Sequence, residues 1–189
     1  MVERAIETPR AIGLVELRSI ARGIETADVM LKHANVDLLR AHVICPGKYI
    51  VLVAGTITHV RSAVAEGQRV APDVVVDQFV LSNVHPSIFP ALTATTEVEH
   101  VGSVGVVECY TLAGAIIAAD TAVKAAPVHL LEIRLPFALG GKAFCIFTGE
   151  LSAVRNAVNS AANRLRDEGV IESFTVIASP HRQLVEKLL

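Results

Sequence analysis

Apolar positions change their spacing several times along the first half of the chain. Residues 12–17 form a short apolar run, which predicts a buried strand. From Ile20 to Leu31 apolar residues recur at helical spacing, and the hydroxyl of Ser19 in front of them is a suitable N-cap. The pattern therefore predicts a strand followed by a helix that ends near Asn35.

Residues 36–81 continue with further strand and helix signals. Two β-rich runs at 36–44 and 48–54 are joined by Cys-Pro-Gly, a sequence typical of a tight turn. A second helix is predicted around 58–65 and a last strand at 74–81. The order strand, helix, two strands, helix, strand predicts an α+β unit in which helices cover one face of a sheet, as in ferredoxin-like domains.

The sequence contains this unit twice, as a tandem repeat. The stretch from Ile12 aligns with the stretch from Val104 at a constant offset, and a two-residue insertion in the second copy precedes the match of VRSAV with VRNAV. Identical pairs include Gly13 with Gly105, Glu16 with Glu108, Asp28 with Asp120, and Lys32 with Lys124. The second copy is expected to have strands at 104–109 and 172–178, helices after Thr111 and at 153–165, and a short terminal helix after His181, matching one after His85. The polar segment 93–102 separates two predicted domains, 11–96 and 103–189.

Composition narrows the function classes. Seventeen Lys and Arg against nineteen Asp and Glu, with no basic run, argue against nucleic acid as a partner. The charged N-terminus does not fit a signal peptide, and no apolar stretch reaches the roughly 20 residues of a membrane span, so a cytoplasmic protein is expected. Apolar residues make up 52% of the chain, which predicts that it hides surface against other copies of itself.

Three cysteines are present, and no CxxC or Cys-His spacing links them. Neither a disulfide framework nor a zinc site within one chain is supported, so a metal site would need ligands from several chains. Cys109 stands at the repeat position of Leu17 and Cys145 at that of Val51, so both are expected in the core. Cys45 instead lies on the tight turn.

The strings AIGLVELRSIARGIETADVMLKHANV and ICPGK, together with the tandem duplication, resemble the trimeric two-domain shell proteins of bacterial microcompartments. The resemblance is strongest to the iron–sulfur-bearing type of propanediol-utilisation compartments. It implies a homotrimer with six lobes, a pseudohexagonal tile that packs with other shell proteins around enzymes, and no catalytic activity. It also implies a central pore lined by Cys45, Pro46, Gly47, Lys48, Ala138, Leu139, Gly140 and Gly141.

The resemblance further implies that Cys45 binds a [4Fe-4S] cluster, one per trimer on the three-fold axis. Thiolates suit iron–sulfur chemistry, and since such clusters ordinarily take four cysteines, three would leave one iron for another ligand. Electron transfer across the shell, with a redox enzyme as partner, and transport of the cluster are both compatible with this site. The alternative is that Cys45 is an ordinary thiol lining an open metabolite pore.

Tile-edge roles are implied for Lys32, Lys124, His85 and His181. From the residues alone, each lysine follows an aspartate by one helical turn and could simply form a solvated ion pair. Tiles of this family often carry an arginine two residues before the histidine, where this chain has Asn83 and Ser179, which weakens that edge contact. The other five histidines have no partners at ligand spacing and are expected on the surface.

Two other classes of protein compete with the shell interpretation. Tandem β-α-β units also build small-molecule sensors, although no glycine-rich phosphate loop occurs at a strand-to-helix turn here. An enzyme would need a catalytic constellation assembled between chains, because neither repeat contains a recognisable nucleophile paired with a base.

Overall fold

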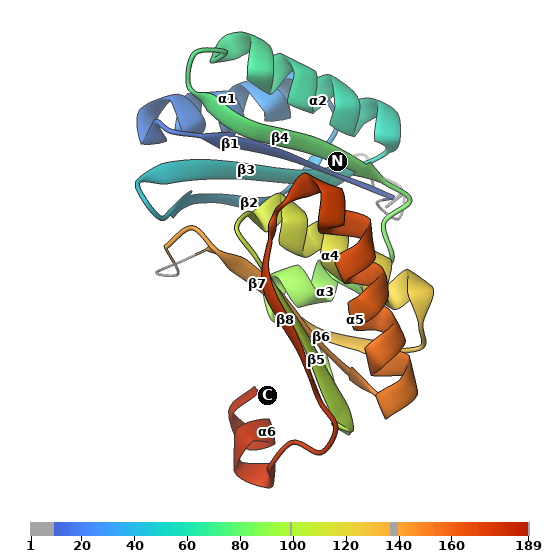
Figure 1. The fold of residues 1–189 in the computed structure, drawn as a ribbon. Coiled ribbons are helices and arrows are strands. Elements are labelled where there is room, and N and C mark those ends of the chain that lie inside the picture. The colour runs from blue at the N-terminus through green and yellow to red at the C-terminus, as the bar shows by residue number, and fades with distance from the viewer. Residues whose placement is uncertain (1–9, 99, 137–139, 189) are drawn as a thin grey trace. The chain divides into compact units, whose positions relative to one another are not determined.

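A computed structural model describes residues 10–98, 100–136 and 140–188 (Figure 1). Its contacts divide the chain into two compact units, with the break between Val84 and His85. The predicted domains at 11–96 and 103–189 stay a prediction. The contacts place the segment that starts at His85 with the second unit, although it follows the first repeat in sequence.

The first unit is a four-stranded antiparallel sheet with two helices on one face (Figure 1). The strand order is β2-β3-β1-β4. Ser19 and Thr56 cap the two helices by accepting hydrogen bonds from the backbone N–H groups of Arg22 and His59. The elements are β1 (Ala11–Leu17), α1 (Ile20–His33), β2 (Asp37–Ile44), β3 (Lys48–Gly55), α2 (Ile57–Val70) and β4 (Val75–Ser82).

The second unit repeats this architecture with the strand order β6-β7-β5-β8. A short helix follows the last strand of each repeat: α3 follows β4, and α6 follows β8. A 3-10 turn, η1, follows α5. Its elements are α3 (Ile88–Thr93), β5 (Ser103–Cys109), α4 (Leu112–Ala125), β6 (His129–Arg134), β7 (Ala143–Gly149), α5 (Leu151–Leu165), η1 (Arg166–Glu168), β8 (Ile171–Ile177) and α6 (Arg182–Leu188).

Each core lies between the sheet and its pair of helices. In the first unit Val15, Leu17, Val51 and Val53 face α1 and α2, and all four are fully buried. Gly13 is needed here because a Cβ at this position would lie 2.6 Å from a methyl group of Val64. The close approach of α2 to β1 thus depends on a glycine, and the same glycine recurs at the matching place in the second repeat.

The predicted α+β class and its element order are confirmed. One boundary is wrong: the first repeat's second helix continues to Val70, well beyond the expected end at residue 65. Gly67 lies inside this extension, where a Cβ would sit 2.8 Å from the sulfur of Met30, so the glycine allows close helix packing. Within the described residues, none of the helices has the length and apolar character needed to cross a membrane.

Candidate functional site

The turn between β2 and β3 places Cys45 at one end of the first sheet. The thiol is partly exposed, and it forms no disulfide. Gly47, two residues later, has a φ of +73°, a left-handed conformation that side chains rarely adopt, and open space surrounds it. The turn thus presents a partly exposed cysteine next to a glycine that has no neighbouring atoms around it.

A charged pair lies directly behind this turn. Lys48 begins β3, and its Nζ lies 2.6 Å from a carboxylate oxygen of Glu16 in β1. Glu16 is only 4% exposed, so Lys48 compensates a carboxylate that the protein has removed from water. Since β1 pairs with β3 on the side away from β2, the ion pair ties the start of β3, the strand that leads out of the turn, to the centre of the sheet.

The second repeat has the same pair with an added partner. Lys142 lies 3.2 Å from Glu108 and 2.9 Å from Glu172, and the hydrogen bonds to Glu172 and Glu108 raise the pKa of Lys142. Tyr110 also donates a hydrogen bond to Glu172, which lowers the pKa of that carboxyl group. This network is more exposed than its counterpart in the first unit.

The other two cysteines differ from Cys45 in their surroundings. Cys109 and Cys145 are completely buried in the sheet of the second unit, as expected. Burial raises the pKa of Cys109 to about 12, and the neighbouring Glu108 carboxylate acts in the same direction. Burial likewise raises the pKa of Cys145. Neither thiol is available as a thiolate at neutral pH, so Cys45 is the sulfur suited to metal chemistry.

The side chains that could ligate a metal determine whether a single chain can bind one. Across residues 10–98, 100–136 and 140–188, no three His, Cys, Asp or Glu side chains gather closely enough to bind a metal ion. An iron–sulfur cluster therefore fits this chain only if several copies each bring one Cys45 thiolate to a shared site. The soft sulfur donor on an open turn suits such an arrangement.

The matching turn of the second unit carries no cysteine. Gly140 and Gly141 both have left-handed φ angles, +63° and +93°, so this turn also relies on glycine. The predicted pore residues Ala138 and Leu139 lie outside the described residues. The two turns thus share a glycine-dependent backbone and differ in their chemistry.

The opposite end of each unit carries the predicted edge lysines. Helix α1 starts beside the turn end of the sheet and runs back for 14 residues, about 21 Å, which brings Lys32 to the far end. There the Lys32 amine lies 2.6 Å from Asp28, and the corresponding Lys124 amine lies 2.5 Å from Asp120. Both ion pairs are therefore present as anticipated from the spacing.

The two aspartates differ in a second contact. Asp120 is buried and also accepts a hydrogen bond from the backbone N–H of His85, 2.8 Å away. Asp28, in contrast, is exposed. The ring of His85 bonds to Ser87, whereas His181 lies exposed before α6. Tile-edge roles for these histidines and lysines stay predictions.

One known domain family matches both repeats of the chain separately. The family model described as "BMC domain" matches residues 11–86 and again residues 103–180. The chain belongs to the BMC domain family. Its two BMC domains stand in tandem, and they place the protein among the shell proteins of bacterial microcompartments.

Individual relatives agree over nearly the whole chain. The bacterial microcompartment shell protein PduT of Citrobacter freundii is 42% identical over 94% of this chain and 98% of that protein. A crystal structure of a microcompartments protein from Desulfitobacterium hafniense has a TM-score of 0.91 and 44% identity, covering 94% of this chain and 98% of that one. The carboxysome assembly protein CcmO of Synechocystis is 28% identical over 88% of this chain and 60% of that protein.

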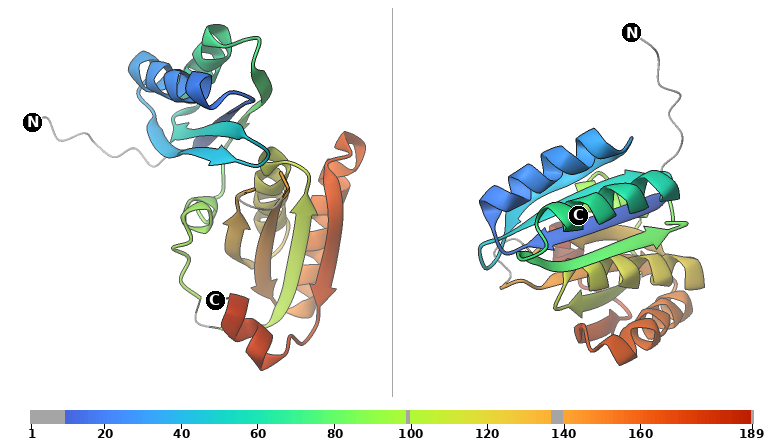
Figure 2. Two further views of the ribbon diagram at one scale, coloured as in Figure 1. Left: turned by 90° about the vertical axis from the view of Figure 1, so that its left-hand side faces the viewer. Right: turned by 90° about the horizontal axis from the view of Figure 1, so that it is seen from above.

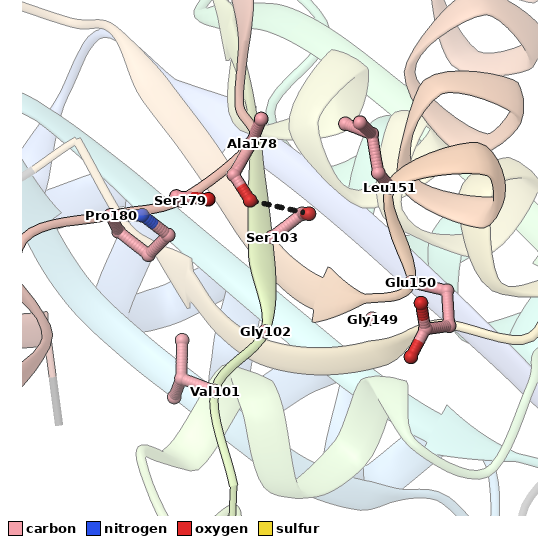
Figure 3. A pocket seen from close by; sticks show the side chains of 9 residues that line it. All are labelled: Val101, Gly102, Ser103, Gly149, Glu150, Leu151, Ala178, Ser179 and Pro180. Atoms are coloured by element: carbon pink, nitrogen blue, oxygen red, sulfur yellow. Dashed lines mark hydrogen bonds between the residues drawn. The ribbon is translucent and has the colours of Figure 1, made fainter.

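A polar pocket of about 430 Å³ opens at the lysine end of the second BMC domain (Figure 3). Ser103 donates to the carbonyl of Ala178 at 2.8 Å, and Thr148 beneath it donates to the carbonyl of Ser103 at 2.9 Å. Both hydroxyl protons are therefore used within the domain.

Two residues of the site were not anticipated from the sequence. Glu16 and Glu108 interrupt apolar strands at the same repeat position. An acidic residue in such a strand indicates that its carboxylate is at least partly buried and has a basic partner. The link between Asp120 and the backbone of His85 had no such sign, since it joins residues that are distant in sequence. The five remaining histidines lie at exposed or half-exposed positions.

Proposed function

We propose that this shell protein forms a homotrimer, a pseudohexagonal tile, in which three Cys45 thiolates hold a [4Fe-4S] cluster at a central pore. The observation that carries the proposal is the contrast among the cysteines: Cys45 lies partly exposed on a turn, and the other two are buried. When bound, the cluster supplies one-electron transfer, which would let the tile pass electrons across the shell or deliver the cluster itself. The protein's role is structural and electronic, with other shell proteins as neighbours.

The difference between α1 and α4 supports assembly from several copies. Ile24 on α1 is 56% exposed, whereas Ile116 at the same repeat position on α4 is fully buried. Ile20 and Leu112 show the same contrast. An apolar stripe that is covered on α4 and lies in water on α1 fits a surface that another copy of the chain covers.

Assembly can be tested by adding a charge to this stripe. Ile24→Glu should raise the dissociation constant of the trimer at least about 100-fold, because a carboxylate would have to be buried without a partner. Ala65→Glu on the exposed side of α2 adds the same charge elsewhere and serves as the control. Sedimentation velocity should report about three times 20.1 kDa for the natural protein. A natural protein that stays monomeric or dimeric would rule out the tile.

The cluster is tested separately, by anaerobic reconstitution with iron and sulfide. The expected result is about four irons per three chains, a brown visible absorption band and, after reduction, an electron paramagnetic resonance signal. Cys45→Ser should lose all of these. Cys145→Val, which installs the residue that the first repeat has at that position, should retain them.

The outcomes of the two experiments separate the alternatives. A trimer that binds no iron, or a Cys45→Ser variant with the full cluster signal, would leave a shell tile with an open metabolite pore. Replacing Lys32 and Lys124 by Ala should then keep the trimer but weaken two-dimensional sheets in electron micrographs, because both amines lie at the proposed tile edge. Sheets that form unchanged would argue against that edge role.

A further inference from the structure

The segments that follow the last strand of each BMC domain share one pattern. The first reads HPSIFPAL from His85 and the second HRQLVEKL from His181, with apolar residues at the fourth, fifth and eighth places of both. In each, the histidine Nδ1 accepts a hydrogen bond from the backbone N–H two residues later, at 3.3 Å. Helices α3 and α6 are therefore repeats of one element, with the same local turn in front.

Helix α3 is docked on the second domain. It packs against β6 and α4, beside the β6 edge of the sheet (Figure 2). Ile88 and Leu92 are buried in this contact. Asp120 of α4 fixes the start of the segment by accepting the N–H of His85, and Leu130 of β6 is only 2% exposed. The docking site thus combines an acidic anchor on the first helix of a domain with an apolar strand beside it.

Helix α6 has apolar residues at the same places, but none of them is fully buried. Leu184, which corresponds to Ile88, is exposed, and Leu188 packs only partly, against a cluster that includes Leu131. The second domain thus covers only the end of α6, and Leu184 lacks the cover that Ile88 has in α3.

The first domain, in turn, has the docking site, and within residues 10–98 no element of this domain occupies it. Leu38 of β2 occupies the repeat position of Leu130 and is 42% exposed. Asp28 of α1 occupies the position of Asp120, and its side chain is exposed. Asp37 at the start of β2 is exposed as well, and it offers a negative charge to Lys187 of α6.

We propose that α6 of one chain docks on β2 and α1 of a second copy, as α3 docks on β6 and α4. Asp28 of that copy accepts the backbone N–H of His181, and the apolar side of α6 covers Leu38. The contact is head-to-tail, from the end of one domain to the face of the next, and contacts of this kind form a closed ring when the rotation between copies closes, as the proposed trimer requires. The proposal rests on the homotrimer proposed above and assigns the C-terminal helix as the arm that joins its chains.

A photo-crosslinking experiment tests the arm in the full-length protein. A benzophenone amino acid at Gln183, an exposed position of α6, should give covalent dimers after irradiation. Mass spectrometry should then map the attachment to β2 or α1. The same probe at Ser87, the matching position before α3, should instead give attachments within the chain, to β6 or α4.

Two substitutions sharpen the assignment. Asp28→Ala should lower the yield of covalent dimers at least about fivefold, because the acceptor for the His181 N–H is lost. Lys32→Ala removes the ion-pair partner but keeps this acceptor, so its yield should stay near that of the natural sequence. Attachments from position 183 only within the chain, or a dimer yield that Asp28→Ala leaves unchanged, would overturn the proposal. Sedimentation of the same samples reports trimer formation independently, so an intact trimer with intrachain attachments rejects the arm alone.

Discussion

The two BMC domains have the same backbone plan but different packing. Strand pairing follows the same register in both, and the irregularities after Glu16 and after Glu108 fall at the same place. Gly23 lies against the ring of Tyr49 in the first domain, and the matching residues in the second are Ala115 and Ala143. A large residue beside a glycine has been exchanged for two small ones, so local volume is conserved while identity is not.

A second pair shows the same exchange. Met30 packs on Gly67 in the first domain, where the second domain has Ala122 and Ala161. The comparison teaches that the period of apolar positions determines this fold, and that each copy then fills its core by compensating changes.

The largest expected effect comes from breaking one such pair. Gly23→Ala would place a Cβ 2.5 Å from the Tyr49 ring and should cost about 2 kcal/mol of unfolding free energy. Tyr49→Ala leaves a cavity and should cost about 3 kcal/mol. The double variant reproduces the pair of the second domain, so its cost should fall short of the sum by at least about 1 kcal/mol.

Urea unfolding at one fixed protein concentration measures this cycle, since assembly contributes to the apparent stability. If the losses of unfolding free energy in the two single variants add fully in the double variant, Gly23 and Tyr49 do not compete for the same space in the core. Full additivity would thereby contradict the idea of compensating exchange between the domains.

The charged pairs behind the turns give the next contrast. Lys48→Met leaves the buried Glu16 carboxylate without its ion-pair partner and should lower the free energy of unfolding by about 3 kcal/mol. Lys142→Met should cost less than about 1 kcal/mol, because Glu108 and Glu172 are each about one third exposed and remain hydrated. Glu16→Gln combined with Lys48→Met should recover part of the loss. Equal costs for the two lysine variants would remove the distinction between the domains.

A smaller effect is expected at Thr26 on α1. Its hydroxyl is buried without a hydrogen-bond partner, and the matching residue of the second domain is Ala118. Thr26→Ala should therefore stabilise the protein by up to about 1 kcal/mol, and Ala118→Thr should destabilise it by about 1 kcal/mol or more. Thr121→Ala is the control, because that hydroxyl already donates to the carbonyl of Ile117 at 2.8 Å. Loss of stability in Thr26→Ala would contradict an unsatisfied hydroxyl.

Local signals made most of the fold predictable. Ser19 and Thr111 cap the expected helices, because the N-cap depends on a few neighbouring residues. The end of α2 was missed because Gly67 and the polar residues around it look like a helix stop. Its contact with Met30, distant in sequence, is what keeps the helix going.

The candidate site was predictable only in part. The repeat pointed to Cys45 as the exposed thiol, because the matching turn of the second half, PFALGGK, carries no cysteine. It could not reveal that Lys48 neutralises Glu16, since strand register decides which acid meets which base. A site that several chains must share has no complete donor set in one chain, so its chemistry shows only in the assembly.

The smallest expected effect concerns Tyr110, whose place in the first domain is taken by Arg18. The Tyr110 hydrogen bond, and then Lys142, hold the pKa of Glu172 below its usual value. Tyr110→Phe should therefore raise the pKa of Glu172 toward that value, and Lys142 should keep part of the lowering. A carboxyl group with a lowered folded-state pKa stabilises the fold above its ordinary pKa, and the stabilisation is lost as the pH falls through the folded-state value. The variant should thus be slightly less stable at neutral pH and equal to the natural protein in acid. Carbon-detected NMR titration of the Glu172 carboxyl measures the shift, and an unchanged pKa would show that Lys142 alone sets it.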